Sequence, residues 1–164
     1  MADSSIECDA ADLRILDLLQ SDASLSNQDL AAAVHISPAT CLRRVKRLTD
    51  AGVIERRVAL LSAARFGAGL TAFAEVSLDA QGAEHLQAFE ARAVADPGVQ
   101  QCYRVSPGPD LMLVLQLPDM AAYHALVQRL FTQDANVRNV KTYFVVHRGK
   151  YETRVPLPHL PVGG

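Results

Sequence analysis

"SPATCLRRVKRL", residues 37–48, places four cationic side chains in five consecutive positions of a chain whose formal net charge is only −2. Ser37 followed by Pro38 is typical of a helix start, because serine caps free N–H groups and proline is tolerated at the first helical position. Gly52 is typical of a helix end. We therefore expect a basic helix that begins at these two residues and ends before Gly52.

This helix has two different faces. Cys41, Val45 and Leu48 recur at the spacing of an inward apolar stripe. A second face carries Thr40, Arg43, Arg44 and Arg47. A charged helix face is often no more than a solvated surface, so the neighbouring elements decide what the charge is for.

Two further helices are predicted upstream. Apolar residues recur at helical spacing over residues 9–19, where Asp9 and Asp12 suit the positive end of a helix. Ser26 and Asp29 have the spacing of a capping box and indicate a short second helix.

The segment "GVIERRVALLS", residues 52–62, alternates loosely and favours a β-hairpin with Arg56 and Arg57 at its tip. Three helices and a hairpin make a winged helix-turn-helix, in which the third helix enters the major groove of duplex DNA. We expect Arg43 and Arg47 to contact bases. Small residues at the helix start let the backbone approach base edges, and these are Ser37, Pro38, Ala39 and Thr40. Candidate phosphate contacts are Ser26, Asn27, Arg44, Arg56 and Arg57.

The second half of the chain has a different pattern. After a glycine-containing connection, strands are expected at 70–79, 99–106, 110–117 and 137–146, with helices at 82–94 and 120–131. This βαββαβ order is the ferredoxin-like arrangement. The fold class is therefore α+β, an N-terminal winged helix-turn-helix followed by a ferredoxin-like domain. The expected boundaries are 1–61 for the DNA-binding domain, 62–70 for the linker, 71–150 for the second domain and 151–164 for a proline-containing tail.

Composition excludes several classes of protein. The 164 residues are 49% hydrophobic, which is enough for a buried core, and no apolar run of about 18 residues predicts a membrane span. The acidic N-terminus is unlike a signal peptide. Cys8, Cys41 and Cys102 are far apart, and the histidines lack partners at ligand spacing. We expect a cytoplasmic protein with reduced thiols and without a metal or a cofactor.

The motif "ISPATCLRRVKRLTDAGVI", residues 36–54, resembles the recognition helix of the Lrp/AsnC (leucine-responsive regulatory protein, "feast/famine") family of transcription regulators. The S-P start, the C-L-R-R-V core and the L-x-x-x-G-V-I ending occur together, and the second half matches in element order. The resemblance implies a homodimer or a higher even-numbered oligomer that binds double-stranded DNA. It also implies an amino-acid effector in a cleft between C-terminal domains.

The predicted effector loop departs from that family's pattern. Relatives commonly have Gly-Asp-Tyr-Asp or Gly-Asp-Phe-Asp there, whereas this chain has "SPGPDLML", residues 106–113. Two prolines remove backbone donors from the loop. The resemblance assigns Asp110 to the effector's ammonium group, the backbone from Ser106 to Gly108 to its carboxylate, and Thr142 to the wall of the cleft.

Two other functions compete with this interpretation of the sequence. Sirohaem decarboxylases resemble the same two-domain layout, and "CYRV", residues 102–105, is similar to their Tyr-Arg strand, but their histidines and tryptophan are missing here. An RNA-binding ferredoxin-like domain needs exposed aromatic residues on its central strands, where this chain supplies only Tyr103. The sequence therefore favours a DNA-binding regulator over an enzyme.

Overall fold

The computed structural model describes residues 7–67 and 69–158. The chain forms two compact units, and the backbone passes between them twice. Unit 1 contains the residues up to Leu60 together with those from Lys150 onwards, and unit 2 contains Leu61–Gly149. Each unit has its own hydrophobic core, so each is described by itself.

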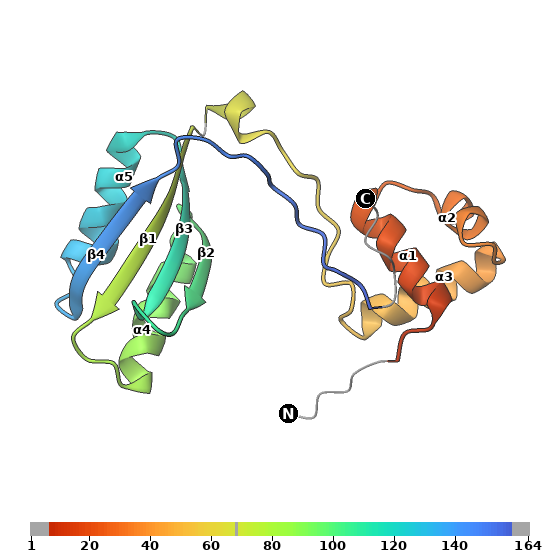
Figure 1. Cartoon of the computed structure of the whole chain (residues 1–164), viewed down its shortest axis with the longest axis horizontal. Coiled ribbons are helices and arrows are strands. Elements are labelled where there is room, and N and C mark those ends of the chain that lie inside the picture. The colour runs from red at the N-terminus through yellow and green to blue at the C-terminus, as the bar shows by residue number, and fades with distance from the viewer. Residues whose placement is uncertain (1–6, 68, 159–164) are drawn as a thin grey trace. The chain divides into compact units, whose positions relative to one another are not determined.

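Unit 1 contains the three predicted helices, α1 (Ala10–Ser21), α2 (Asn27–Ala33) and α3 (Pro38–Asp50) (Figure 1). Their apolar faces meet in one core, as the helical spacing of these residues requires. The buried members of this core are Ile15, Leu16, Leu30, Ala31, Val34, Cys41 and Leu48. The helix-turn-helix prediction is confirmed.

The predicted helix ends are also found. The Ser26 hydroxyl accepts a hydrogen bond from the backbone N–H of Asp29, and the Ser37 hydroxyl accepts one from Thr40, each at 3.2 Å. Gly52 follows α3 with a φ of 73°, a left-handed conformation that glycine adopts at little cost. Local sequence therefore determines where α2 and α3 begin and where α3 stops.

A capping box starts α1. The Asp9 carboxylate accepts hydrogen bonds from the backbone N–H groups of Ala11 and Asp12, both at 2.9 Å, and the Asp12 carboxylate accepts one from Asp9 at 3.1 Å. The hydrogen bond from Asp12 N–H and the nearby Arg44 guanidinium lower the pKa of Asp9 from 3.8 to about 2. The charged form of Asp9 is therefore the one that stabilises the fold.

The β-hairpin predicted for residues 52–62 does not form. Residues 55–62, all of which the structure describes, run as extended chain without a β-strand. An Arg-Arg tip lacks the glycine, asparagine or aspartate that a tight hairpin turn requires, and an isolated pair of strands is marginally stable. Because no second strand of the described chain pairs with this segment, its apolar residues Val58 and Leu60 are exposed.

The described part of the C-terminal tail packs on unit 1. Arg154 forms an ion pair of 2.5 Å with Asp17 of α1, and the backbone N–H of Val155 donates to the Gln20 side chain at 2.6 Å. Leu157 packs against the core of unit 1. The sequence predicted a separate tail at residues 151–164. In its described part this segment contacts α1 through Arg154 and Val155, and Leu157 is partly buried against the core.

Unit 2 has the predicted βαββαβ order (Figure 1). A short helical turn, η1 (Ala63–Phe66), precedes the sheet, and α5 continues into a wider helical turn, η2 (Val127–Thr132). The main elements are β1 (Leu70–Leu78), α4 (Ala83–Ala95), β2 (Val99–Arg104), β3 (Leu111–Leu117), α5 (Met120–Leu126) and β4 (Val137–Phe144). The strand order is β2-β3-β1-β4, and every neighbouring pair is antiparallel.

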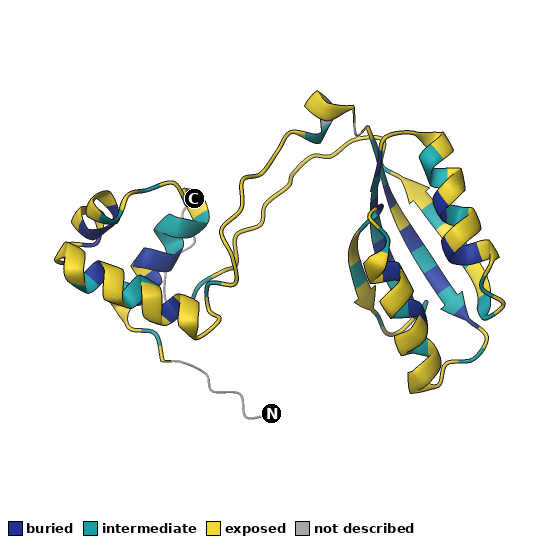
Figure 2. Cartoon of the chain, turned by 180° about the vertical axis from the view of Figure 1, so that it is seen from behind, coloured by how far each residue is buried: buried dark blue, intermediate teal, exposed yellow. Residues whose placement is uncertain are grey.

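The two faces of this sheet differ. Every second residue of β3, from Leu111 to Leu117, is buried beneath α4 and α5, while Met112 and Val114 between them are partly exposed (Figure 2). β3 is therefore buried on one face only. The strand pairing puts further side chains on the helix-free side. We call this side the open face, and it carries Phe73, Tyr103, Met112, Val114 and Tyr143.

The lowered pKa of Asp9 predicts an acid-dependent loss of stability. A carboxyl whose folded-state pKa is depressed stabilises the fold above its unfolded pKa, and that stabilisation is lost as the pH falls through the folded value. The contribution of Asp9 should therefore be complete above a pH of about 4 and disappear towards about 2. Thermal melts between neutral pH and these acid values should show a shallower pH dependence for Asp9→Asn than for the wild type.

Asp22 and Asp96 also have lowered pKa values, because Ser24 and Arg129 respectively donate hydrogen bonds to them. These two carboxyls are present in both the wild type and Asp9→Asn. The difference between the melts therefore isolates Asp9. Parallel curves for the two proteins would contradict the prediction.

Candidate DNA interface and effector site

The starts of α2 and α3 lie together. The Asn27 side chain donates a 2.9 Å hydrogen bond to the backbone carbonyl of Pro38, which joins the two helix starts. The Ser37 hydroxyl donates to the Thr40 hydroxyl at 2.8 Å, and Pro38 and Ala39 are exposed. The structure thus brings the predicted contacts at these two helix starts onto one part of the surface of unit 1.

The inward stripe of α3 is confirmed, because Cys41 and Leu48 are buried and Val45 packs against the core. The cations of α3 are in three different situations. Arg43 is exposed, and no ion pair to it is found in the described parts of the chain. Lys46 pairs with Asp50 one helical turn later, at 2.8 Å.

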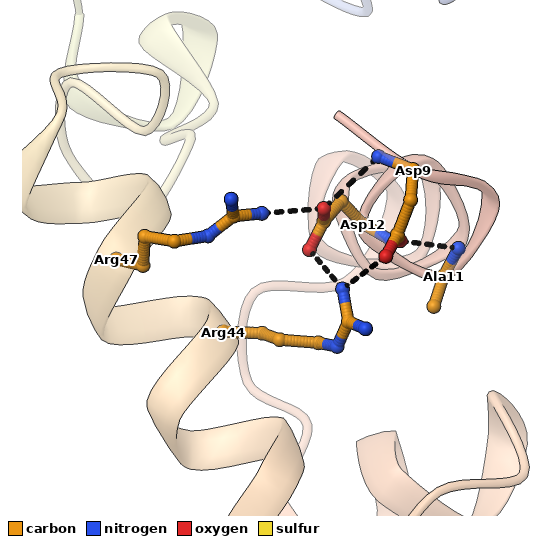
Figure 3. Close-up of polar contacts among 5 residues, drawn as sticks. All are labelled: Asp9, Ala11, Asp12, Arg44 and Arg47. Carbon is orange, nitrogen blue, oxygen red and sulfur yellow. Dashed lines mark hydrogen bonds and ion pairs between the residues drawn. The ribbon is translucent and has the colours of Figure 1, made fainter. Parts of the chain in front are cut away.

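Arg44 and Arg47 turn towards α1 instead (Figure 3). Arg44 Nη1 lies 2.7 Å from an Asp9 carboxylate oxygen and 2.9 Å from Asp12 Oδ1. Arg47 Nη2 lies 2.5 Å from Asp12 Oδ2. We call these four residues the Asp-Arg cluster, and it joins the start of α1 to the middle of α3.

The Asp-Arg cluster determines what Arg44 can do. The hydrogen bonds that Arg44 donates to Asp9 first and to Asp12 second raise the pKa of Arg44, and only 25% of its side chain is exposed. Release of Arg44 would leave the buried Asp12 carboxylate with one compensating cation fewer, which is unfavourable. The predicted phosphate contact of Arg44 therefore competes with the cluster.

Arg56 and Arg57 are both exposed in the extended segment rather than at a hairpin tip. They line a cavity of about 890 Å³ together with the C-terminal half of α1 and Val155. The three arginines of α3 line a different cavity, of about 480 Å³. The structure therefore groups the arginines of α3 and places the other two elsewhere on unit 1.

The predicted effector loop is braced by Asp110. Its carboxylate accepts a 2.7 Å hydrogen bond from the backbone N–H of Leu78, and its backbone N–H donates to Val76 at 2.9 Å. Ser106 and Gly108 are exposed in the same loop. Asp110 thus holds the loop against the end of β1.

Thr142 lies in a different place. It pairs with Ala74 in the sheet, and its hydroxyl accepts a 3.0 Å hydrogen bond from Tyr123 of α5. Ala74 and Leu78 are four residues apart on one strand, which corresponds to about 13 Å. One chain alone therefore does not bring Thr142 to the loop that contains Asp110.

Other kinds of site find no support. In residues 7–67 and 69–158, no group of three or more His, Cys, Asp or Glu side chains is placed to hold a metal ion. Cys8, Cys41 and Cys102 are free thiols. No helix in the same ranges is long and apolar enough to span a membrane.

The comparisons with known proteins agree with this layout. The model of a winged helix-turn-helix DNA-binding domain matches residues 9–55, and that of the Lrp/AsnC ligand binding domain matches residues 71–155. The leucine-responsive regulatory protein of Rhizobium meliloti is 37% identical over 152 residues, which cover 93% of this chain and 97% of that protein.

Two solved structures are similar over nearly the whole chain. An AsnC family transcriptional regulator from Agrobacterium tumefaciens has a TM-score of 0.85 and 34% identity, covering 91% of this chain and 97% of that one. A transcriptional regulator of Neisseria meningitidis in complex with L-Met has the same TM-score and identity, covering 93% and 99%. With its DNA-binding helix-turn-helix and its ligand-binding domain, the chain belongs to the Lrp/AsnC family of transcription regulators.

Proposed function

We propose that α3 enters the major groove of its target DNA and that Arg43 and Arg47 read base edges there. The observation that carries this proposal is Arg43, an exposed cation with no ion pair in the described parts of the chain, on the third helix of a winged helix-turn-helix. A long cationic side chain in this position suits the acceptors on guanine. Arg47 keeps part of its guanidinium exposed and is the second candidate reader.

The remaining contacts fix the position of the protein on DNA. The exposed backbone at Ser37, Pro38 and Ala39, with Thr40 beside them, lies at the end of α3 that approaches the bases. Phosphate contacts fall to the exposed side chains of Arg56 and Arg57 and to the N-terminal end of α2 at Ser26 and Asn27. Arg44 serves the Asp-Arg cluster instead.

Dimerisation is proposed to use the open face of unit 2. This face carries aromatic and aliphatic side chains that no helix of the described chain covers. The strand pairing places Glu75, Gln101 and Lys141 on the same face beside these side chains. Exposed apolar surface with polar residues at its side marks an interaction site, and most homo-oligomers have closed symmetry. A homodimer, or a higher even-numbered oligomer, would present two winged helices to a two-fold symmetric DNA site.

An amino acid is the proposed effector. The similar Neisseria meningitidis regulator was solved with L-Met, and the match to the Lrp/AsnC ligand binding domain covers residues 71–155. Because Asp110 and Thr142 are far apart in one chain, the site would form between C-terminal domains of two copies. Asp110 would then face the ammonium group, the backbone from Ser106 to Gly108 the carboxylate, and Thr142 would line the wall.

The same proposal places the protein in the cytoplasm, where its DNA target would be. The relatives reported above are transcription regulators, and none supports the alternative of a sirohaem-decarboxylase-like enzyme. Effector binding would change DNA binding by favouring one assembly over another, in proportion to the difference in its affinity for the two.

The DNA proposal predicts a loss of discrimination in Arg43→Ala. Removal of a base contact should reduce the preference for a selected operator over random duplex by about 5- to 150-fold, equivalent to ~1–3 kcal/mol. Arg57→Ala is the control, because loss of a phosphate contact should weaken both duplexes equally and lower the salt dependence by about one unit of slope. Anisotropy titrations against both duplexes would measure this. Equal weakening of both by Arg43→Ala would make it a phosphate contact instead.

The open face predicts a monomeric variant. Val114→Glu places a carboxylate in the middle of this apolar surface, where burial against a second copy would leave the charge unpaired. Size-exclusion chromatography with light scattering should therefore show a shift from the oligomer to the monomer. Val146→Glu is the matched control, because Val146 is fully exposed in the same unit and should keep the oligomer. Identical masses for both variants and the wild type would contradict the proposed interface.

The effector proposal predicts that Asp110→Asn loses amino-acid binding but not the fold. Asparagine can still accept the hydrogen bond from Leu78 N–H, so the loop brace is kept while the charge is removed. In a thermal-shift screen that includes L-methionine, a ligand at about 100 times its dissociation constant should add roughly 2.7 kcal/mol to the stability of the wild type. The variant should melt like the unliganded wild type and show no shift. An unchanged shift would remove Asp110 from the site, and no shift with any amino acid would contradict an amino-acid effector.

A further inference from the structure

Asp12 is the only charged residue that is fully buried in the described parts of the chain. A buried carboxylate is strongly unfavourable unless hydrogen bonds and opposite charges compensate it. Asp12 receives three donors, from the backbone N–H of Asp9, from Arg44 and from Arg47 (Figure 3). Two of these donors come from α3, the helix proposed to enter the major groove of DNA.

The Asp12 carboxylate is a fixed point in unit 1. It belongs to the first turn of α1, and the capping box with Asp9 holds it from one side. Neighbours on that helix, Leu13 and Ile15, are buried. A group bonded to Asp12 is therefore held at a position set by the fold of unit 1.

The two arginines that bind Asp12 differ in how much of their guanidinium groups remains exposed. Arg44 is mostly covered, and its Nε atom is buried without a hydrogen-bond partner. Arg47 contacts Asp12 through one terminal nitrogen, and 44% of its side chain is exposed. A guanidinium has five N–H donors, so Arg47 keeps donors on its exposed side while it is anchored. Arg47 is thus held in place and still able to bind.

An unanchored arginine loses side-chain conformational freedom when it is fixed in one geometry. For Arg47 that loss occurs on folding, because Asp12 already restricts the side chain in the free protein. A side chain ordered before binding loses less entropy when it meets its target. We propose that Asp12 is a positioning residue for operator recognition, which orients Arg47 on α3 so that its free N–H groups meet base edges. This inference rests on the proposed function of α3.

The effect of Asp12 on DNA binding can be separated from its charge and from its role in the fold. Loss of a carboxylate near the DNA-binding helix would raise the affinity for every duplex through general electrostatics. Loss of folded protein would lower the affinity for every duplex. Loss of positioning alone changes the ratio between operator and random duplex, so this ratio is the quantity to measure.

The test compares Asp12→Asn with Asp9→Asn in the full chain. Asp9 shares the capping box and Arg44 but does not contact Arg47, which makes it the matched control. Anisotropy titrations would use the preferred duplex selected by the wild type from a random library and a scrambled duplex of equal length. Asp12→Asn should reduce the operator-to-scrambled affinity ratio at least 5-fold, and Asp9→Asn should leave it unchanged. An unchanged ratio in Asp12→Asn would overturn the proposal.

A double-mutant cycle with Arg47→Ala adds a second criterion. If Asp12 acts through Arg47, the double variant should lose no more discrimination than Arg47→Ala alone. Additive losses would overturn the proposal. If neither Arg43→Ala nor Arg47→Ala changes the ratio, the proposed role of α3 itself fails. Loss in Arg47→Ala without loss in Asp12→Asn refutes only the positioning role.

A spectroscopic measurement on the wild type needs no variant of Asp12 to fold. In ¹⁵N NMR of the DNA-free protein, the guanidinium of Arg47 should give signals of hindered rotation, while that of the exposed Arg43 should rotate freely. The signals are assigned with Arg47→Lys and Arg43→Lys, both at exposed positions. Free rotation of Arg47 would overturn the proposal as directly as an unchanged affinity ratio.

Discussion

A single carboxylate that cannot reach water, that of Asp12, constrains the arrangement of unit 1. Its charge has to be compensated inside the fold, and the two positively charged partners both come from α3, beside one backbone N–H at the start of α1. The Asp-Arg cluster therefore joins α1 to α3 through ion pairs at the edge of the helix-turn-helix, whereas Cys41 and Leu48 join α3 to the core through apolar contacts. The orientation of α3 relative to α1 depends on both.

The same constraint separates the arginines of α3 into different classes. In the sequence, the neighbouring cations of a charge run look equivalent. In the structure, the exposed fraction of each guanidinium determines whether that arginine is available to bind a partner. Arg43 is available, Arg47 is anchored by one end, and Arg44 is committed to the fold. Under the proposed function, discrimination between DNA sequences would depend on Arg43 and Arg47, whereas Arg44 in the same run of residues stabilises the domain.

Unit 2 follows from alternation in its strands. One side of β3 is buried by α4 and α5, and the other side stays partly exposed because no third layer of the described chain covers it. If Asp110 and Thr142 both contact the effector, as proposed, their separate positions in one chain require a second copy of unit 2. The exposed aromatic residues of the open face would meet the same second copy.

Local signals were sufficient to predict the helices and strands. Ser26, Ser37 and Gly52 mark helix ends through hydrogen bonds within a few residues, and alternation marks the strands because side chains of a sheet point to opposite faces. Two expectations depended on more than this. The hairpin at residues 52–62 has the right apolar pattern but no turn residue and no partner strand. The exposure of Arg43 follows from the helical spacing, whereas the partners of Arg44 and Arg47 on α1 were not predicted.

The missed contacts share a physical cause. Asp12 and Arg47 are 35 residues apart, and Asp17 and Arg154 are 137 apart. Neither distance leaves a periodic trace in the sequence, since such pairs depend on the path of the whole chain. The bond from Leu78 N–H to Asp110 is missed for the same reason, because it crosses from one strand to a loop 32 residues later.

The backbone passes between the two units at Leu60–Leu61 and again at Gly149–Lys150. The chain returns to α1 through Arg154, Val155 and Leu157, so unit 1 is attached to unit 2 by two strands of peptide rather than by one. A protease that cuts only the connection after Leu60 therefore leaves a nicked molecule whose DNA-binding unit is still held through the docked C-terminal segment. Separation of the units requires a second cut or the release of that segment.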